Sequence, residues 1–356
     1  MTSGLGGCEG SMSVTDSTAT GFDSDQLAAY LAERIPGFAG PLTAKKFSDG
    51  QSNPTFLLTT PGGQYVLRRK PPGQLLKSAH AVDREYRVLS ALAASDVPVP
   101  RVFHLCEDDS VIGSAFYVME YLEGRVFWDP ALPDLSAEER RAVYNEMNNV
   151  LAAIHSVDLK AAGLEDYGRP GNYFERQVSR WSQQYQASQT ETLPAMDSLI
   201  EWLPANLPPD DGQVSLIHGD YRIDNLMFAP DRLEVIAVFD WELSTLGHPL
   251  ADLAYQVMQR YMGRDWQIKG LAGLDCKALG IPSEQQYISD YCQRMGISGI
   301  DHWSFYLAFS FFRFAAICQG VKHRALQGNA SSSDAGAVGA MAAPLAELGW
   351  KVASSS

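Results

Sequence analysis

The side chains best suited to chemistry lie in the segment 216–242, where two apolar runs each lead into an acidic residue. The first run continues into His-Gly-Asp, which ends at Asp220, and the second leads directly into Asp240. Asn225 lies five residues after Asp220. A carboxylate that follows a buried strand is costly to leave without a partner, so this pattern indicates a metal site or a catalytic site.

These three polar positions meet the main needs of phosphoryl transfer. That reaction requires oxygen ligands for Mg²⁺, a base for the acceptor hydroxyl group and donors for the phosphates. We assign Asp220 as the base, and Asn225 and Asp240 as the metal ligands. Two other interpretations stay open, an ordinary polar turn between strands and a metal-dependent phosphohydrolase. The second is less favoured because the seven histidines are scattered along the chain.

The segments HGDYRIDN and DWE, in this order, resemble the aminoglycoside phosphotransferase and choline-kinase group, whose members have a protein-kinase-like fold. HGDYRIDN stands where protein kinases carry their catalytic loop, and Asp240-Trp241-Glu242 stands where they carry Asp-Phe-Gly. The resemblance implies the α+β class with two lobes, a β-rich N-lobe with one main helix and a larger α-helical C-lobe. It also implies ATP as phosphoryl donor and Mg²⁺ as metal ion.

A kinase-like site needs a cation for the phosphates and a glutamate that holds this cation. Glu85 lies on the apolar face of a predicted helix, where a carboxylate needs a cationic partner. Arg68, Arg69 and Lys70 are the candidates, and strand alternation does not choose among them because both preceding residues are apolar. The resemblance favours Arg68, which replaces the usual kinase lysine and would grip phosphate as a fork. A local surface ion pair of Glu85 is the alternative.

Two further segments are candidates for nucleotide contacts. Ser52 and Asn53 lie in a turn with a single glycine and could donate hydrogen bonds to the terminal phosphates, although a plain hairpin turn explains them equally well. The run FYVMEYLEG resembles a kinase hinge. The resemblance implies that Met119 lies behind the adenine and that the backbones of Glu120 and Leu122 pair with its edge. A plain buried strand fits the same side chains.

Further polar residues lie near the expected base in the sequence. Arg222 could contact the transferred phosphate, as a lysine does in protein kinases, or form a surface pair with Asp224. Glu242 could assist the metal or a substrate cation. We expect His218 to hold the loop through hydrogen bonds and Asp252 to fix the same loop by capping or pairing.

The elements that must position these residues follow from hydrophobic periodicity and turn signals. The first half predicts a short helix capped by Asp23, then strands and one helix, and the second half is mostly helical. The predicted strands are 43–47, 55–59, 64–69, 101–106, 115–121, 214–217, 225–228 and 235–239. The predicted helices are 79–94, one from Ser136, 173–186, 195–203, 249–262, 283–295, 301–323 and 335–348. We expect a disordered tail over 1–22, a nucleotide-binding N-lobe over 23–120, a catalytic and substrate-binding C-lobe over 121–350 and a tail over 351–356.

Composition narrows the class of partner. The net charge of −14 makes nucleic acid an unfavourable partner, so we expect a small-molecule hydroxyl substrate. Five cysteines without a C-x-x-C pair predict reduced thiols. The first 22 residues lack the features of a signal peptide, and the apolar run 303–312 is too short to span a bilayer. We therefore expect a cytoplasmic protein without a membrane partner, and the oligomeric state stays open, a homodimer included.

The acceptor rests on resemblance alone. The segments GQSNPTFLL, YVLRRKPPG and DWELSTLGHPLADLAY are similar to kinase domains fused to acyl-CoA dehydrogenases in animals, over roughly residues 42–261. That similarity implies phosphorylation of a hydroxyl group on a hydroxyacyl-CoA or a hydroxy acid. An aminoglycoside- or amino-alcohol-directed kinase and a nucleotide-binding pseudokinase without turnover are the alternatives. Aromatic residues of the helical half could line the acceptor pocket, but such stripes are more often core.

Overall fold

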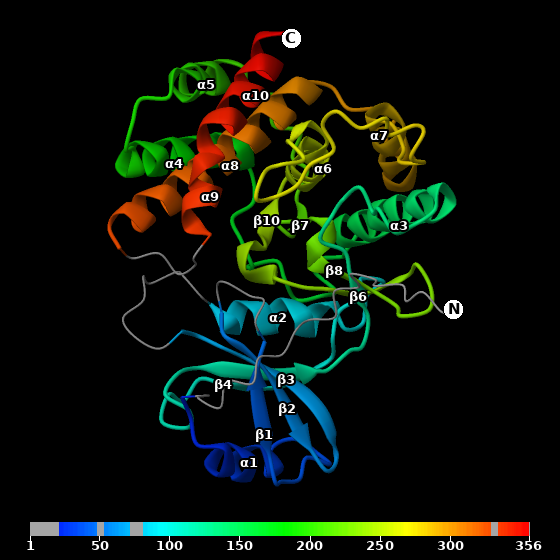
Figure 1. Ribbon diagram of the computed structural model, residues 1–356, viewed down its shortest axis with the longest axis vertical. Helices are drawn as coiled ribbons and strands as arrows, with labels where there is room; N and C mark the ends of the chain where they lie inside the picture. Colours follow the sequence, from blue (N-terminus) through cyan, green and yellow to red (C-terminus); the bar gives the residue numbers. More distant parts are fainter. Residues whose placement is uncertain (1–20, 48–52, 72–80, 329–333, 356) are drawn as a thin grey trace, which may run out of the picture. The chain divides into compact units, whose positions relative to one another are not determined.

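A computed structural model describes residues 21–47, 53–71, 81–328 and 334–355 of the protein (Figure 1). The chain divides into two compact units. The first comprises Met1–Trp128 and Asp224–Glu242, and the second comprises Asp129–Ile223 and Leu243–Ser356. The predicted boundary at residue 120 therefore differs from the observed one, and the segment 224–242 belongs with the N-terminal unit. Most of the predicted tail 1–22 and most of the turn that contains Ser52 lie outside the described residues.

The first unit is built on an antiparallel sheet with strand order β1-β2-β3-β5-β4. Its strands are β1 (Thr43–Lys46), β2 (Thr55–Thr60), β3 (Gly63–Arg69), β4 (Val102–Cys106) and β5 (Phe116–Glu120). Helices α1 (Ser24–Ala32) and α2 (Val82–Leu92) lie on opposite sides of this sheet in Figure 1. Asp23 caps α1 by accepting two backbone N–H groups, as its position predicts.

The pleat of the sheet decides which side chains face which helix, because successive side chains point to opposite faces. Leu67, Phe116 and Val118 belong to the apolar cluster that packs on α1. The neighbouring residues Arg68 and Tyr117, which are register partners on β3 and β5, therefore face α2. Both faces of β3 are covered, which is why its sequence shows no clear alternation.

A second, smaller sheet in the same unit has the order β6-β8-β9. It consists of β6 (Arg125–Val126), β8 (Leu226–Phe228) and β9 (Val235–Val238), and the pairing of β6 with β8 ties the segment 224–242 to the first unit. A side chain at Gly124 would lie 2.4 Å from the Met227 side chain and 2.5 Å from the Phe228 carbonyl oxygen. Only glycine fits this close approach, because it has no Cβ. The sequence did not predict β6, which is only two residues long.

The second unit is helical apart from the pair β7 (Ser215–Ile217) and β10 (Thr245–Gly247). Its helices are α3 (Ala137–His155), α4 (Tyr173–Ser188), α5 (Pro194–Ala205), α6 (Leu250–Met258), α7 (Glu284–Met295), α8 (Trp303–Leu326), α9 (Ala335–Ala340) and α10 (Ala342–Ser354). The helix predicted from Ser136 is confirmed as α3, and Ser136 caps it in a capping box with Glu139. In the part of the chain that is described, α8 is the one helix long and apolar enough to cross a membrane. Its apolar window is 83% buried, as in the core helix of a globular domain.

The C-terminal helices differ from the prediction. The structure breaks the predicted helix 335–348 at Met341 and continues it as α10 to Ser354, so residues 351–354 are helical and not a tail. The reason is packing, because Leu345, Gly349 and Ala353 of α10 are buried at helical spacing. The α+β class expected from the sequence is confirmed.

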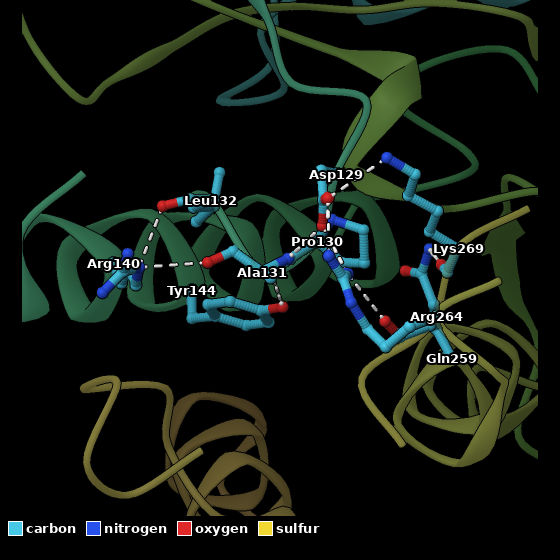
Figure 2. A network of polar contacts seen from close by, with 10 residues as sticks. Asp129, Pro130, Ala131, Leu132, Arg140, Tyr144, Gln259, Arg264 and Lys269 are labelled. Atoms are coloured by element: carbon cyan, nitrogen blue, oxygen red, sulfur yellow. Dashed lines mark hydrogen bonds and ion pairs between the residues drawn. The ribbon is translucent and has the colours of Figure 1, made fainter. Parts of the chain in front are cut away.

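A polar network fixes the loop between the start of the second unit and α3 (Figure 2). Arg264 makes two hydrogen bonds to the carboxylate of Asp129, at 2.6 and 2.7 Å, and Lys269 lies 3.4 Å from it. Burial would raise the pKa of Asp129, but the hydrogen bonds from Arg264 and from the backbone N–H of Ala131 lower it to about 2. Arg140 completes the network by donating to the carbonyl oxygens of neighbouring loop residues, among them Ala131.

We expect Asp129→Asn to lower the melting temperature at pH 7 by about 2–4 °C, or about 1 kcal/mol after solvent screening of a partly exposed pair. The folded-state pKa of about 2 lies below the unfolded value of about 3.9. The stabilisation is therefore complete above about pH 4 and is lost as the pH falls toward 2, so the difference from wild type should shrink at acidic pH. Thermal melts at several pH values test this, with Asp231→Asn as control because its ion pair is exposed. A pH-independent difference would contradict it.

Candidate functional site

Arg68 is the centre of a buried ion-pair cluster in the first unit. Its Nε lies 2.8 Å from a carboxylate oxygen of Glu85 on α2, and its Nη2 donates to Asp240 Oδ1 at 2.6 Å. The Arg68 side chain is 13% exposed and that of Glu85 is 2% exposed. Burial would lower the pKa of Arg68, but the two carboxylates raise it above its usual value. The guanidinium therefore stays charged and is held from two sides.

Glu85 receives two further hydrogen bonds besides its pair with Arg68. Asn53 Nδ2 donates at 2.7 Å and the hydroxyl group of Tyr117 donates at 3.1 Å. Burial raises the pKa of Glu85, while Arg68, Tyr117 and Asn53 act in the opposite direction. The sequence makes Asn53 a candidate donor to the terminal phosphates. In the structure its buried amide donates to Glu85, because a buried carboxylate requires donors on both oxygens.

The two expected metal ligands lie at one end of the β8–β9 pair. The backbone N–H of Phe239 donates to the carbonyl oxygen of Asn225 at 2.9 Å, which places Asp240 next to Asn225 along the hairpin. Asp240 has a positive φ of 61°, a conformation that non-glycine residues rarely adopt and that is concentrated at functional sites.

This donor set fits Mg²⁺. Magnesium is commonly bound by one or two protein oxygen ligands together with waters and substrate phosphates. Among the described residues, no group of three or more His, Cys, Asp or Glu side chains could hold a metal ion. A carboxylate and an amide in the same unit as the buried cation Arg68 therefore suit a metal that binds together with phosphates, and not a metal held by the protein alone.

The expected hinge lies at the end of β5 in the same unit. Met119 is buried and pairs in register with Val66, and the backbone N–H of Glu120 donates to the carbonyl oxygen of Arg101 at 2.8 Å. Leu122 packs against the small apolar cluster of the β6-β8-β9 sheet, to which Met227 contributes. The segment therefore combines an ordered backbone with an apolar surface, which is what a flat heteroaromatic ring requires.

In the second unit, Asp252 on α6 fixes the His-Gly-Asp loop through hydrogen bonds to its backbone. Its carboxylate accepts the backbone N–H groups of His218 at 2.6 Å and Gly219 at 2.8 Å, and His155 lies 3.5 Å away. Burial would raise the pKa of Asp252, but His155, His218 and the Gly219 N–H hold it below its usual value. The expected loop-fixing roles of Asp252 and of His218, whose Nδ1 accepts the Asp220 N–H, are confirmed.

Glycine is required within this loop. Gly219 has a φ of 85°, and a Cβ there would lie 2.6 Å from the carbonyl oxygen of Leu243. Both the backbone conformation and the close contact exclude a larger residue. The backbone conformation of the loop therefore depends on glycine at this position. That conformation determines where the side chain of Asp220 lies.

Asp220 emerges from this loop with its side chain 20% exposed. The hydroxyl group of Tyr255 donates to Asp220 Oδ1 at 2.7 Å, and Arg222 Nε lies 3.3 Å from the same oxygen. Arg313 on α8 donates to the carbonyl oxygen of Gly219 at 2.7 Å. Tyr255 and Arg313 are not among the site residues that the sequence predicts. Tyr255 could have been found, since it lies three residues after Asp252 and so on the same face of α6.

The structure thus divides the predicted site residues between the units. The first unit contains the residues predicted for the nucleotide and the metal, namely Asn53, Arg68, Glu85, Met119, Glu120, Leu122, Asn225 and Asp240. The second unit contains Asp220 and Arg222. Ser52 lies outside the described residues. Among the aromatic residues of the helical half, Tyr173, Trp181, Tyr185 and Phe312 are buried core residues.

Both units correspond to parts of a kinase-like phosphotransferase fold. The sequence profile of the Phosphotransferase enzyme family matches residues 43–280, and the chain belongs to this family. A crystal structure of a Ralstonia eutropha protein assigned to the aminoglycoside phosphotransferases is 53% identical with a TM-score of 0.86, over 94% of this chain and 99% of that one. Aminoglycoside phosphotransferase APH(4)-Ia, solved with AMP-PNP and hygromycin B, shares the fold at 17% identity and a TM-score of 0.60, over 93% of this chain and all of that one.

Curated relatives are much longer proteins. Mouse acyl-CoA dehydrogenase family member 10 is 50% identical over 92% of this chain, and human acyl-CoA dehydrogenase family member 11 is 46% identical over 93%. The chain spans only 31% and 43% of the length of these two proteins. The similarity to kinase domains that occur together with acyl-CoA dehydrogenases, expected from the sequence, is confirmed.

We expect Glu85→Ala to destabilise the protein by about 3–5 kcal/mol, because it leaves the buried Arg68 and Asn53 without their carboxylate. Tyr117→Phe removes one hydrogen bond to the same carboxylate and should cost about 1–3 kcal/mol. Urea unfolding followed by circular dichroism measures both. Asp83→Ala is the matched control, since it lies on the same helix and its contact with Lys70 is 3.6 Å long and partly exposed. Equal stability of the Glu85 and Asp83 variants would refute the cluster's structural importance.

Proposed function

We propose that this protein is an ATP- and Mg²⁺-dependent kinase that transfers a γ-phosphoryl group to a hydroxyl group of a small molecule. The observation that carries the proposal is the Arg68 cluster, in which a permanently charged fork lies between Glu85 and Asp240. A structural ion pair would need only one of these carboxylates. The second belongs to the Asp-Trp-Glu segment, which is the expected metal-binding position.

Each residue has a definite task in this reaction. The fork of Arg68 binds phosphate oxygens, while the Met119 side chain and the backbones of Glu120 and Leu122 receive the adenine. Asn225 and Asp240 hold Mg²⁺, which when bound neutralises phosphate charge and orients the transferred group. Asp220 accepts the proton of the acceptor hydroxyl group as its oxygen bonds to phosphorus and the bond to the ADP oxygen breaks. Arg222 stabilises the charge of the transferred group.

A hydroxyacyl-CoA or a hydroxy acid is the acceptor class we favour. Its support is the likeness to the acyl-CoA dehydrogenase family members, together with the local charge around Asp220. Arg222 lies beside Asp220 and Arg313 contacts the preceding residue, so cations flank the base. Such surroundings suit an anionic acceptor better than a polycationic one.

The four described cysteines are free thiols, which supports a cytoplasmic location.

Asp220→Asn should reduce phosphoryl transfer by about 100- to 10,000-fold, the usual contribution of a positioned base, without loss of Mg·ATP binding. Asp240→Asn should instead weaken Mg·ATP binding itself, because it removes a metal ligand. Transfer is measured with labelled ATP over hydroxyacyl-CoAs, hydroxy acids, aminoglycosides, amino alcohols and sugars, and binding by calorimetry. Glu234→Gln, an exposed change in the β8–β9 turn, is the control.

Full turnover by Asp220→Asn would show that another group is the base. Transfer to aminoglycosides alone would exclude the favoured acceptor class. Nucleotide binding without transfer to any acceptor would favour a pseudokinase, which the presence of Asp220, Asn225 and Asp240 together argues against.

A further inference from the structure

Tyr255 contacts the expected base from the core of the second unit. It lies on α6, it is buried, and its hydroxyl group donates to Asp220 Oδ1 at 2.7 Å. Packing alone would be satisfied by phenylalanine. A buried hydroxyl group costs free energy unless it is hydrogen-bonded, and the hydrogen bond of Tyr255 goes to Asp220. The hydroxyl group therefore serves the carboxylate and not the core.

Helix α6 holds both the backbone of this loop and the side chain of Asp220. Asp252 accepts the backbone N–H groups of His218 and Gly219, so it fixes the path of the main chain just before Asp220. Tyr255, less than one helical turn further on, fixes the side chain of Asp220 itself. The main chain before Asp220 and the side chain of Asp220 are thereby both held by helix α6. A precisely placed catalytic group requires this kind of support from a rigid element.

Arg313 on α8 supplies a third contact. Its side chain is buried, its Nη2 donates to the Gly219 carbonyl oxygen at 2.7 Å, and its guanidinium lies 5.4 Å from the ring centre of Tyr255 and 5.7 Å from that of Trp181. No ion pair of Arg313 with a carboxylate is found in the described part of the chain. A buried cation that relies on a carbonyl oxygen and two aromatic faces is unfavourable for stability alone.

From these contacts we infer that Tyr255 and Arg313 are positioning residues for Asp220. Tyr255 orients the carboxylate through its hydrogen bond to Oδ1, and Arg313 holds both the Gly219 carbonyl and the ring of Tyr255. This inference rests on the proposed role of Asp220 as the base. Both residues belong to the second unit, whereas the residues predicted for the nucleotide belong to the first. We therefore expect both to act on turnover and not on nucleotide affinity.

Tyr255→Phe should lower kcat by about 10- to 100-fold, the range expected for the loss of one hydrogen bond to a charged group, and leave KM for ATP unchanged. The matched control is Tyr221→Phe. Tyr221 is equally buried and lies next to Asp220 in sequence, but its hydroxyl group donates to the Met147 carbonyl oxygen, also at 2.7 Å. It should therefore affect melting temperature and leave kcat near that of wild type. Equal kcat losses in the two variants would overturn the inference.

Arg313 is tested by a conservative pair of substitutions. Arg313→Met removes the donor to Gly219, whereas Arg313→Lys keeps a donor and a cation. We expect the lysine variant to recover most of the kcat that the methionine variant loses. Equal losses in both variants, or no loss in either, would overturn the role of Arg313.

Two measurements separate this inference from the proposed function. If Asp220→Asn keeps full turnover, the base assignment fails whatever Tyr255 does. If Asp220→Asn is inactive while Tyr255→Phe turns over like wild type, only the positioning inference fails. Crystal structures of wild type and Tyr255→Phe give a readout that needs no acceptor. The Asp220 carboxylate should occupy one orientation in wild type and several in the variant, and one unchanged orientation in both would overturn the inference.

Discussion

The first unit depends on one constraint, the burial of the Arg68 guanidinium. A buried charge must be paired, and two carboxylates from distant parts of the sequence meet this need, Glu85 from α2 and Asp240 from the end of β9. Tyr117 and Asn53 then satisfy the remaining demands of Glu85. The sheet, the helix packed on it and the hairpin that carries the proposed metal ligands are thereby fixed relative to one side chain. If Arg68 binds phosphate as we propose, its side chain is oriented before the ligand binds, which reduces the entropy lost on binding.

In the second unit, a buried carboxylate holds the loop that precedes Asp220. Asp252 receives two backbone N–H groups, so it fixes the shape of the loop whatever side chains the loop carries. Gly219 makes that shape sterically accessible, Tyr255 contacts the side chain of Asp220, the proposed base, and Arg313 contacts the Gly219 carbonyl oxygen. Ion pairs between side chains thus organise the first unit. Hydrogen bonds from backbone N–H groups to a buried carboxylate organise the loop of the second unit.

The sequence predicted most helices and strands, since amphipathic periodicity and capping residues are local signals. It also placed Asp220, Asn225 and Asp240 in the segment that the structure shows to be ordered by Asp252 and by the β8–β9 pair. Strand alternation could not choose among Arg68, Arg69 and Lys70, because α1 and α2 cover both faces of β3 and the alternation disappears. The hydrogen bonds of Asn53 and Tyr255 join residues 32 and 35 positions away, and no local pattern encodes such pairs. The strands β6 and β10 are too short to show the alternation of apolar and polar residues that identifies a strand.

The central claim is that Arg68 is the phosphate-binding cation of a nucleotide site and not only a structural ion-pair partner. Calorimetric titration of Arg68→Lys with Mg·ATP and with adenosine tests it most directly, because lysine keeps the charge between Glu85 and Asp240 but lacks the fork. We predict that affinity for Mg·ATP falls by about 10-fold or more, because one charge-assisted hydrogen bond is lost, while affinity for adenosine stays the same. Equal changes for both ligands, or none for either, would contradict it.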